Sequence, residues 1–139
     1  GGLEDVGVVE PTAHALIALK KVAHRQSDGT LSSRIEFGEK MLIVVRSSDG
    51  GWNYGSPRAL GHDLPSYAET TGLALAGLQD HAPAGAVEHA RSIPPDRISP
   101  LARAWLRLAL GETMGTGTPP DSGNDILLTA LEANDPNFL

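Results

Sequence analysis

Apolar residues along this 139-residue chain recur mostly at spacings of three and four, which is the period of an amphipathic helix. Over 33–47, for example, Gly38, Met41, Leu42 and Val45 fall on one helical face. The Asp-Gly-Gly sequence that follows should end this helix, because consecutive glycines permit a sharp reversal of the backbone. The pattern therefore predicts a helix that runs directly into a tight turn.

Three segments of the chain resemble one another, which indicates an internal repeat. Residues 10–19 and 69–78 are identical at five of ten aligned positions, and residues 100–108 form a weaker third copy. Self-similarity of this kind is typical of helical arrays, in which each unit buries its apolar face only by stacking on the next. Because these three helices carry small apolar residues nearly all round, we expect them to form a buried inner row.

The remaining segments supply the connections and an outer row of helices. We expect the first helix over 13–22, with Pro11 in its first turn, and a turn over 27–29. A polar loop that contains proline should cover 56–65, followed by a third helix that runs to about residue 80. The last expected elements are a short helix over 84–92, a loop over 111–120 and a final helix over 126–133. The sum is a single all-α domain over 1–139 with about three helical hairpins.

The stretch around the two glycines is the feature around which the helices are arranged. Trp52 and Tyr54 follow Gly50 and Gly51 closely, and both rings are too large and too apolar for a free loop. We therefore expect both rings to pack onto neighbouring helices. Asp49 completes this turn, which we interpret as a structural clamp and not as a site of chemistry.

The turn and the helix before it resemble the QW motif of squalene and oxidosqualene cyclases, and the related repeat of protein prenyltransferase β subunits. The residues that carry the resemblance are Gly38, Met41, Leu42, Arg46, Gly50 and Trp52. Two positions depart from the motif, because the family usually has a basic residue where Phe37 stands and a glutamine where Arg46 stands. In the family, that glutamine ties the turn to the start of the next helix.

The repeated segments strengthen this resemblance. Their sequences look like those of a bacterial prenyltransferase/squalene-oxidase repeat domain. They read Glu-Pro-Thr-Ala-x-Ala-Leu from residue 10 and Glu-Thr-Thr-Gly-Leu-Ala-Leu from residue 69. The resemblance implies an all-α fold of repeated helical hairpins in an α/α-toroid-like arc, a partial toroid. A full toroid has about twice as many hairpins. We therefore expect further sequence, the terminal segments or a second copy in a homodimer to cover the open ends.

Charge and composition narrow the range of partners. The chain has a net charge of −6 and no large basic cluster, which argues against a nucleic-acid partner. It contains no cysteine, so it has no disulfide framework and no thiolate ligand for a metal. No apolar run is long enough to span a membrane, and no signal peptide is recognisable. The compartment is undetermined, with the cytoplasm favoured over secretion.

Candidate ligand-binding residues come from the repeated helices. His14 stands where the other two copies have Leu73 and Arg103, near the start of an inner helix, which in toroids faces the central cavity. Glu10 and Glu69 could supply carboxylates to the same cavity, and Arg103 is the fourth candidate. The alternative is structural: a histidine satisfied by its neighbours, and acids that stabilise helix N-termini. We predict no metal site and no cofactor. Three further acid and histidine pairs are interpreted as solvated surface: His62-Asp63, Asp80-His81 and Glu88-His89.

Three functions stay open. The first is a non-catalytic module that binds an apolar ligand, for example an isoprenoid, or a protein partner on its concave face. The chain lacks the Asp-x-Asp-Asp acid motif of the cyclases and the cysteine of the prenyltransferase zinc site, which favours this reading. The second is a fragment or subunit of a terpene cyclase-like or prenyltransferase-like enzyme whose catalytic acid lies outside this chain. The third is a free-standing enzyme that uses His14, Glu10 and Glu69 in one pocket.

Overall fold

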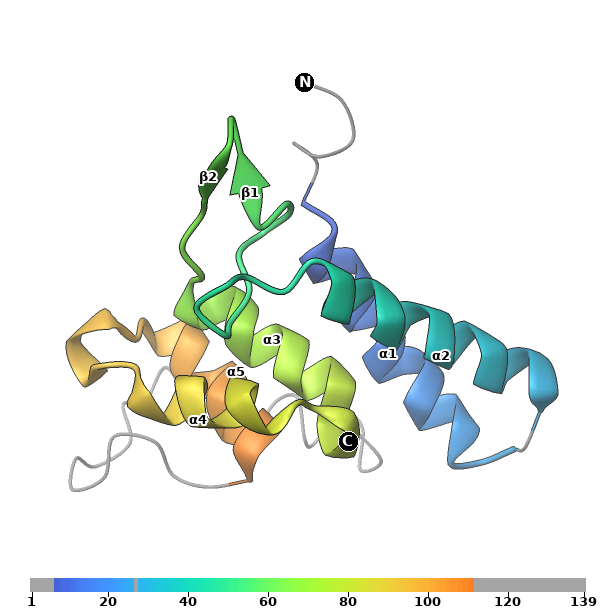
Figure 1. The fold of residues 1–139 in the computed structure, drawn as a ribbon. Helices are drawn as coiled ribbons and strands as arrows, with labels where there is room; N and C mark the ends of the chain where they lie inside the picture. The colour runs from blue at the N-terminus through green and yellow to red at the C-terminus, as the bar shows by residue number, and fades with distance from the viewer. Residues whose placement is uncertain (1–6, 27, 112–139) are drawn as a thin grey trace.

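A computed structural model describes residues 7–26 and 28–111, and five α-helices account for most of these residues (Figure 1). Within the same ranges, two short strands form an antiparallel hairpin, and two 3₁₀ turns cover Gln79–His81 and Pro95–Arg97. The elements are α1 (Val9–Ala23), α2 (Gly29–Val44), β1 (Arg58–Ala59), β2 (His62–Asp63), α3 (Ala68–Leu78), α4 (Ala84–Ser92) and α5 (Pro100–Leu110). The described chain is mainly helical, which agrees with the all-α class predicted from the sequence.

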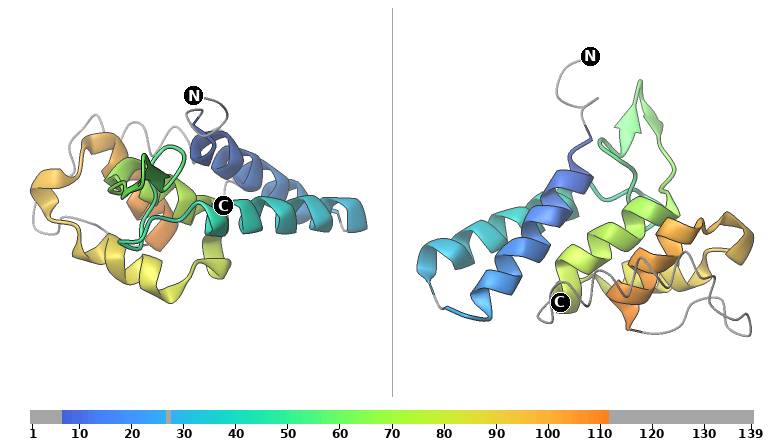
Figure 2. Two further views of the ribbon diagram at one scale, coloured as in Figure 1. Left: turned by 45° about the horizontal axis from the view of Figure 1, so that its top comes forward. Right: turned by 180° about the vertical axis from the view of Figure 1, so that it is seen from behind.

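The three similar segments form α1, α3 and α5, which lie side by side with α3 in the middle (Figure 1, Figure 2). Helix α2 packs against α1, and α4 packs against α3. Only α3 is buried along most of its length, over residues 70–78, whereas α1 and α5 each keep an exposed face. The expectation of a fully buried inner row is thus wrong for the two flanking helices. Within the described residues, each of them has an inner-row neighbour on one side alone.

Two glycines let α3 approach both neighbours closely. A Cβ atom added to Gly77 would lie 3.1 Å from the carbonyl oxygen of Ala13 in α1. One added to Gly72 would lie 2.9 Å from the Cβ of Trp105 in α5. A larger side chain at either position would push the helices apart, so the small residues of the repeat set the spacing of the row.

The two-glycine turn joins α2 to α3 through the buried side chain of Trp52. The indole Nε1 donates to the Leu42 carbonyl at 2.7 Å, and the main-chain nitrogen of Trp52 donates to Thr71 Oγ1 at 3.0 Å. Tyr54 is 40% exposed, and its ring lies beside that of Tyr67 at the start of α3, with centroids 5.6 Å apart. Its hydroxyl reaches Glu69 at the surface of the molecule and finds its hydrogen-bond partner there.

Arg46 and Asp49 stabilise this turn, where the resembled motif relies on a glutamine. The Arg46 Nε donates to the Gly50 carbonyl at 2.9 Å, and its guanidinium lies 5.9 Å from the centre of the Trp52 ring. Asp49 accepts from the main-chain nitrogen of Ser66 at 3.0 Å. The acidic side chain thus makes the tie to the start of α3, because arginine has donors only and cannot accept from that nitrogen.

The bounds of α2 differ from the sequence-based expectation of a helix over 33–47. The helix begins at Gly29, where we expected a turn, because Asp28 caps it by accepting from the Thr30 nitrogen at 2.9 Å. It ends at Val44, before the turn sequence begins. The aspartate that looks like a turn residue is therefore a helix start signal.

The segment 56–65, expected to be a loop, contains the β1–β2 hairpin. The hairpin turns at Leu60 and Gly61, whose φ values of +51° and +79° fit a two-residue type I′ turn. Such turns are usually announced by Asn-Gly or Asp-Gly, so the sequence signal for this hairpin is weak. The predicted helix over 126–133, and the predicted loop over 111–120 apart from its first residue, lie outside the described residues.

Candidate functional site

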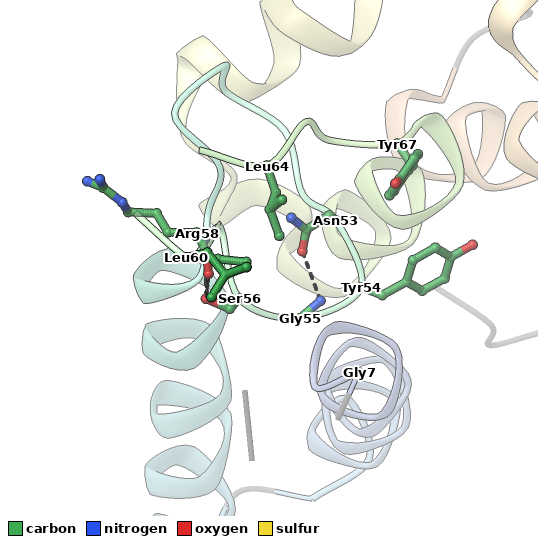
Figure 3. A pocket seen from close by; sticks show the side chains of 10 residues that line it. Gly7, Asn53, Tyr54, Gly55, Ser56, Arg58, Leu60, Leu64 and Tyr67 are labelled. Atoms are coloured by element: carbon green, nitrogen blue, oxygen red, sulfur yellow. Dashed lines mark hydrogen bonds between the residues drawn. The ribbon is translucent and has the colours of Figure 1, made fainter. Parts of the chain in front are cut away.

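A cleft of about 590 Å³ opens between the β1–β2 hairpin and the start of α1 (Figure 3). We call it the hairpin cleft. Its walls come from the segment before α1, the end of the two-glycine turn, the hairpin and the start of α3. The side chains that matter most for its chemistry are Asn53, Tyr54, Leu60, Leu64 and Tyr67. Its volume is that of an ordinary small-molecule site.

Apolar and aromatic side chains form much of the wall of the hairpin cleft. Leu60 at the hairpin tip is 98% exposed, and Tyr54 and Tyr67 are about half exposed. The two tyrosine rings lie together on one side, with centroids 5.6 Å apart. Arg58 extends away from the cleft, and its guanidinium donates to the Gly61 carbonyl at 3.1 Å (Figure 3). The cleft is thus suited to an apolar guest.

Asn53 adds a buried polar group to this wall. Its side-chain oxygen accepts from the Gly55 nitrogen at 2.9 Å, which fixes the orientation of the amide. The amide nitrogen of Asn53 is buried and has no hydrogen-bond partner among the described residues. A buried donor left unpaired costs about 1–3 kcal/mol, so such a group requires an explanation.

Two of the predicted acids, Glu10 and Glu69, line a smaller cavity of about 50 Å³ together with Tyr54 and Trp105. Glu69 accepts from the Tyr54 hydroxyl at 2.9 Å and from the Ser99 hydroxyl at 3.4 Å. The hydrogen bond to Glu69 raises the pKa of the Tyr54 hydroxyl, because loss of its proton would place two negative charges side by side. Glu69 is therefore already engaged by its neighbours, and the cavity is too small for a substrate.

His14 and Arg103 do not join these two acids. His14 is exposed on α1 and meets the edge of the Trp105 ring, with centroids 5.5 Å apart. Arg103 is half-buried on α5 and lines neither the small cavity nor the hairpin cleft. The structure thus brings Glu10 and Glu69 to one cavity and leaves the other two candidate residues outside it.

Sequence reasoning missed a cluster in which Ser66 lies between an acid and a histidine. The Ser66 Oγ is 2.9 Å from Asp49 Oδ2 and 3.1 Å from His89 Nε2. A carboxylate can only accept, so the serine proton goes to Asp49, and His89 donates from Nε2. In a nucleophilic triad the histidine takes the serine proton instead, so this order indicates a structural tie. The sequence signal for this cluster is Asp-Gly-Gly, because an aspartate before two glycines favours a turn in which its side chain accepts hydrogen bonds.

Two carboxylates are stabilised in their charged form. Partial burial alone would raise the pKa of each, but hydrogen bonds and nearby positive charge outweigh this effect and lower it. For Asp49 the main donor is Ser66, and for Glu39 the partners are Lys20 at 2.7 Å and His81 at 2.6 Å. His81 lies at the surface, as the sequence suggested, although it contacts Glu39, whereas His89 is half-buried and contacts Ser66.

Comparison with known proteins does not identify a family for this chain. The chain matches no protein-family model, and no curated protein or solved structure is significantly similar to it. Across residues 7–26 and 28–111, no helix has the length and apolar character needed to cross a membrane. The same residues contain no group of three or more acidic or histidine side chains placed to hold a metal ion. Function therefore has to be inferred from the geometry of the clefts.

Proposed function

We propose that this chain is a non-catalytic binding module that holds an apolar ligand, with one hydrogen-bond acceptor, in the hairpin cleft. In this proposal, the helices form an open arc of the α/α-toroid kind, related to the repeats of terpene cyclases and prenyltransferase β subunits. The side-by-side order of α1, α3 and α5 supports such an arc, because successive repeats of a toroid place their inner helices next to one another.

The observation that carries the proposal is the unpaired side-chain nitrogen of Asn53. Its burial costs free energy in the empty protein, and a ligand oxygen would recover that cost once a shift of the cleft wall opens the nitrogen to the cleft. A hydrophobic residue of similar size would remove the unpaired donor, but it would also remove the acceptor of the Gly55 nitrogen. The bond to Gly55 explains the oxygen of this amide, and a partner outside the chain would account for its nitrogen.

The walls of the cleft define the class of ligand. Leu60 and Leu64 offer aliphatic contacts, and Tyr54 and Tyr67 offer two aromatic rings inclined at 43° to one another. An isoprenoid alcohol has the required features, namely a branched hydrocarbon chain and one oxygen. This site differs from the concave inner row expected from the sequence, because the middle helix of that row, α3, is already buried by protein.

The test is thermal unfolding of the whole chain with farnesol and with farnesene, the same kind of hydrocarbon without the oxygen. A ligand that binds only the folded state raises the melting temperature, and at equal concentration the tighter ligand raises it more. We expect farnesol to stabilise the protein clearly more than farnesene, and the Asn53→Leu variant to lose that preference.

The matched controls are Leu60→Ser in the cleft and Val44→Ser on α2. Both side chains are strongly exposed, at 98% and 76%, but Val44 does not line the cleft. Only Leu60→Ser should weaken the effect of farnesol. Equal stabilisation by farnesol and farnesene, or none by either, would contradict the proposed site.

A further inference from the structure

Helix α1 carries an exposed apolar stripe on the side opposite Ala13, the residue that contacts α3. Pro11, Ala15, Ala18 and Val22 recur at spacings of four, three and four, so they lie on one face of the helix. All four are exposed. We call these four residues the α1 stripe. A continuous apolar face of this kind on a folded helix marks a contact surface.

A groove beside the stripe extends the apolar surface onto α2. It has a volume of about 290 Å³, and Leu19, Phe37 and Met41 are among its lining residues. Phe37 is 68% exposed, and Val44, on the same face of α2, is 76% exposed. The surface therefore contains both an apolar projection, the ring of Phe37, and an apolar groove next to it.

The internal repeat indicates what kind of element fits the α1 stripe. In the aligned repeats, position 18 of α1 corresponds to position 77 of α3. Gly77 is the point at which α3 receives α1, since a Cβ added there would lie 3.1 Å from the Ala13 carbonyl. Ala18 is also small, but it is exposed. Helix α1 thus presents to solvent the face with which α3 receives a repeat helix.

We propose that the α1 stripe is a dimer interface, on which α1 of a second copy packs in the antiparallel direction. A twofold axis between Ala15 and Ala18 would place Ala15 against the partner's Ala18, and Pro11 against the partner's Val22. The stripe is therefore complementary to itself, as a twofold contact requires. In such a dimer, the exposed Phe37 ring of each copy would project toward the apolar groove of the other copy.

Charge favours the antiparallel direction. The first turn of α1 is acidic through Glu10 and its last turn is basic through Lys21, whereas Lys20 is engaged within the chain by Glu39 and the Leu78 carbonyl. An antiparallel pair brings the acidic end of each helix toward the basic end of the other, and it also opposes the two helix dipoles. A parallel pair would place like charges together. No residue of the stripe or groove lines the hairpin cleft, so this interface is independent of ligand binding.

The interface is tested by light scattering on the whole chain across roughly a hundredfold range of concentration. We expect a concentration-dependent rise toward twice the chain mass of 14.6 kDa. Ala18→Glu should weaken the dimer at least about tenfold, because it buries a charge at the contact. The control Ala84→Glu, at an exposed first residue of α4, should dimerise like the parent chain. A parent that stays monomeric, or two variants with equal affinity, would overturn the proposal.

A second measurement covers the case in which a variant folds poorly. The chain has no cysteine, so Ala18→Cys and Ala84→Cys each introduce a sole thiol. Under mild oxidation, Ala18→Cys should form a covalent dimer several times faster than Ala84→Cys, because its two thiols would lie close to the twofold axis, less than one helical turn apart. Equal rates in both variants, with circular dichroism spectra like that of the parent, would show that this face does not pair.

Discussion

The tip of the β1–β2 hairpin holds a leucine where turns of this type usually hold asparagine or aspartate. Leu60 has φ of +51°, which costs a residue with a side chain about 1–2 kcal/mol, and it is 98% exposed. In the free protein, both the positive φ of Leu60 and the exposure of its apolar side chain to water are thus unfavourable. Strain of this kind is commonly retained where a residue serves binding. Leu60 lines the hairpin cleft, which is consistent with that role.

Leu60→Asn should therefore stabilise the free protein and weaken ligand binding at the same time. Asparagine tolerates positive φ, so we expect a gain of about 0.5–1 kcal/mol in the free energy of unfolding. Urea unfolding measures the gain, and thermal unfolding with farnesol measures the loss of binding. Val44→Asn is the control, since it exchanges an exposed apolar residue of α2 and should not stabilise. A destabilised Leu60→Asn variant would mean that Leu60 supports the fold.

The ion cluster of Glu39, Lys20 and His81 makes a separate prediction about pH. The pKa of Glu39 is lower in the folded protein than its ordinary value of 4.5, so the unfolded chain binds more protons as the pH falls. Its contribution to stability is therefore complete above about pH 4.5 and is lost as the pH falls through the lowered folded pKa. Glu39→Gln should reduce the acid loss of stability, measured by unfolding between about pH 6 and pH 3.

The control for this pH effect is Glu36→Gln. Glu36 pairs with Lys40 at 3.0 Å, but both side chains are largely exposed, so the pair should contribute little. Its removal should leave the pH profile of stability close to that of the parent chain. If the two variants change the acid loss equally, the cluster around Glu39 does not have the role assigned to it.

Single residues also show where sequence reasoning ends. The burial of Trp52 could be expected from its size, because a large ring next to a two-glycine turn finds a core position. The unpaired nitrogen of Asn53 could not, since a lone asparagine in a turn normally reads as a turn former. His14 was singled out by its place in the repeat, yet in the folded chain its ring meets Trp105 at the surface.

At the scale of elements, close packing of the row depends on the glycines of α3. Gly77→Ala should force α1 and α3 apart, because the new Cβ would lie 3.1 Å from a main-chain oxygen that cannot move freely. We expect a loss of about 1–3 kcal/mol in the free energy of unfolding, measured in urea. Gly29→Ala is the matched control, since a Cβ there meets nothing within 4 Å. It should stabilise α2 by about 0.5–1 kcal/mol.

If Gly77→Ala instead matches Gly29→Ala in stability, α1 and α3 are not packed as closely as described. The same pair of variants also separates two effects of glycine. Both substitutions raise helix propensity, but only the one in α3 creates a clash. The difference between them is therefore a measure of the packing of the row alone.

The boundaries of a helix could be predicted where residues that start or stop helices, such as proline, stand directly beside it. Helix α4 was expected over 84–92 and has those bounds, because proline stands just before it and again shortly after it. The start of α2 was not predicted, because Ser-Asp-Gly signals a turn as well as a helix cap, and the capping bond of Asp28 decides between them. The hairpin was missed because its turn lacks the usual asparagine.

At the scale of the whole molecule, the sequence repeat predicted which helices lie side by side, and α1, α3 and α5 do so. It could not predict which clefts form, because the hairpin cleft is built from connections between repeats and not from the repeats themselves. The toroid-like arc and the binding of an isoprenoid-like ligand are proposals, and both are part of one central claim. The claim is that the connections at one end of the helical row form the binding site.

The most direct test of that claim is a two-dimensional ¹H–¹⁵N NMR titration of the labelled chain with farnesol. We expect the largest shifts in the segment that contains Asn53, Leu60 and Tyr67, and in the side-chain amide resonances of Asn53 itself, which would gain a hydrogen bond. Shifts centred instead on the groove of α1 and α2, or an unchanged Asn53 side chain at saturation, would contradict the account.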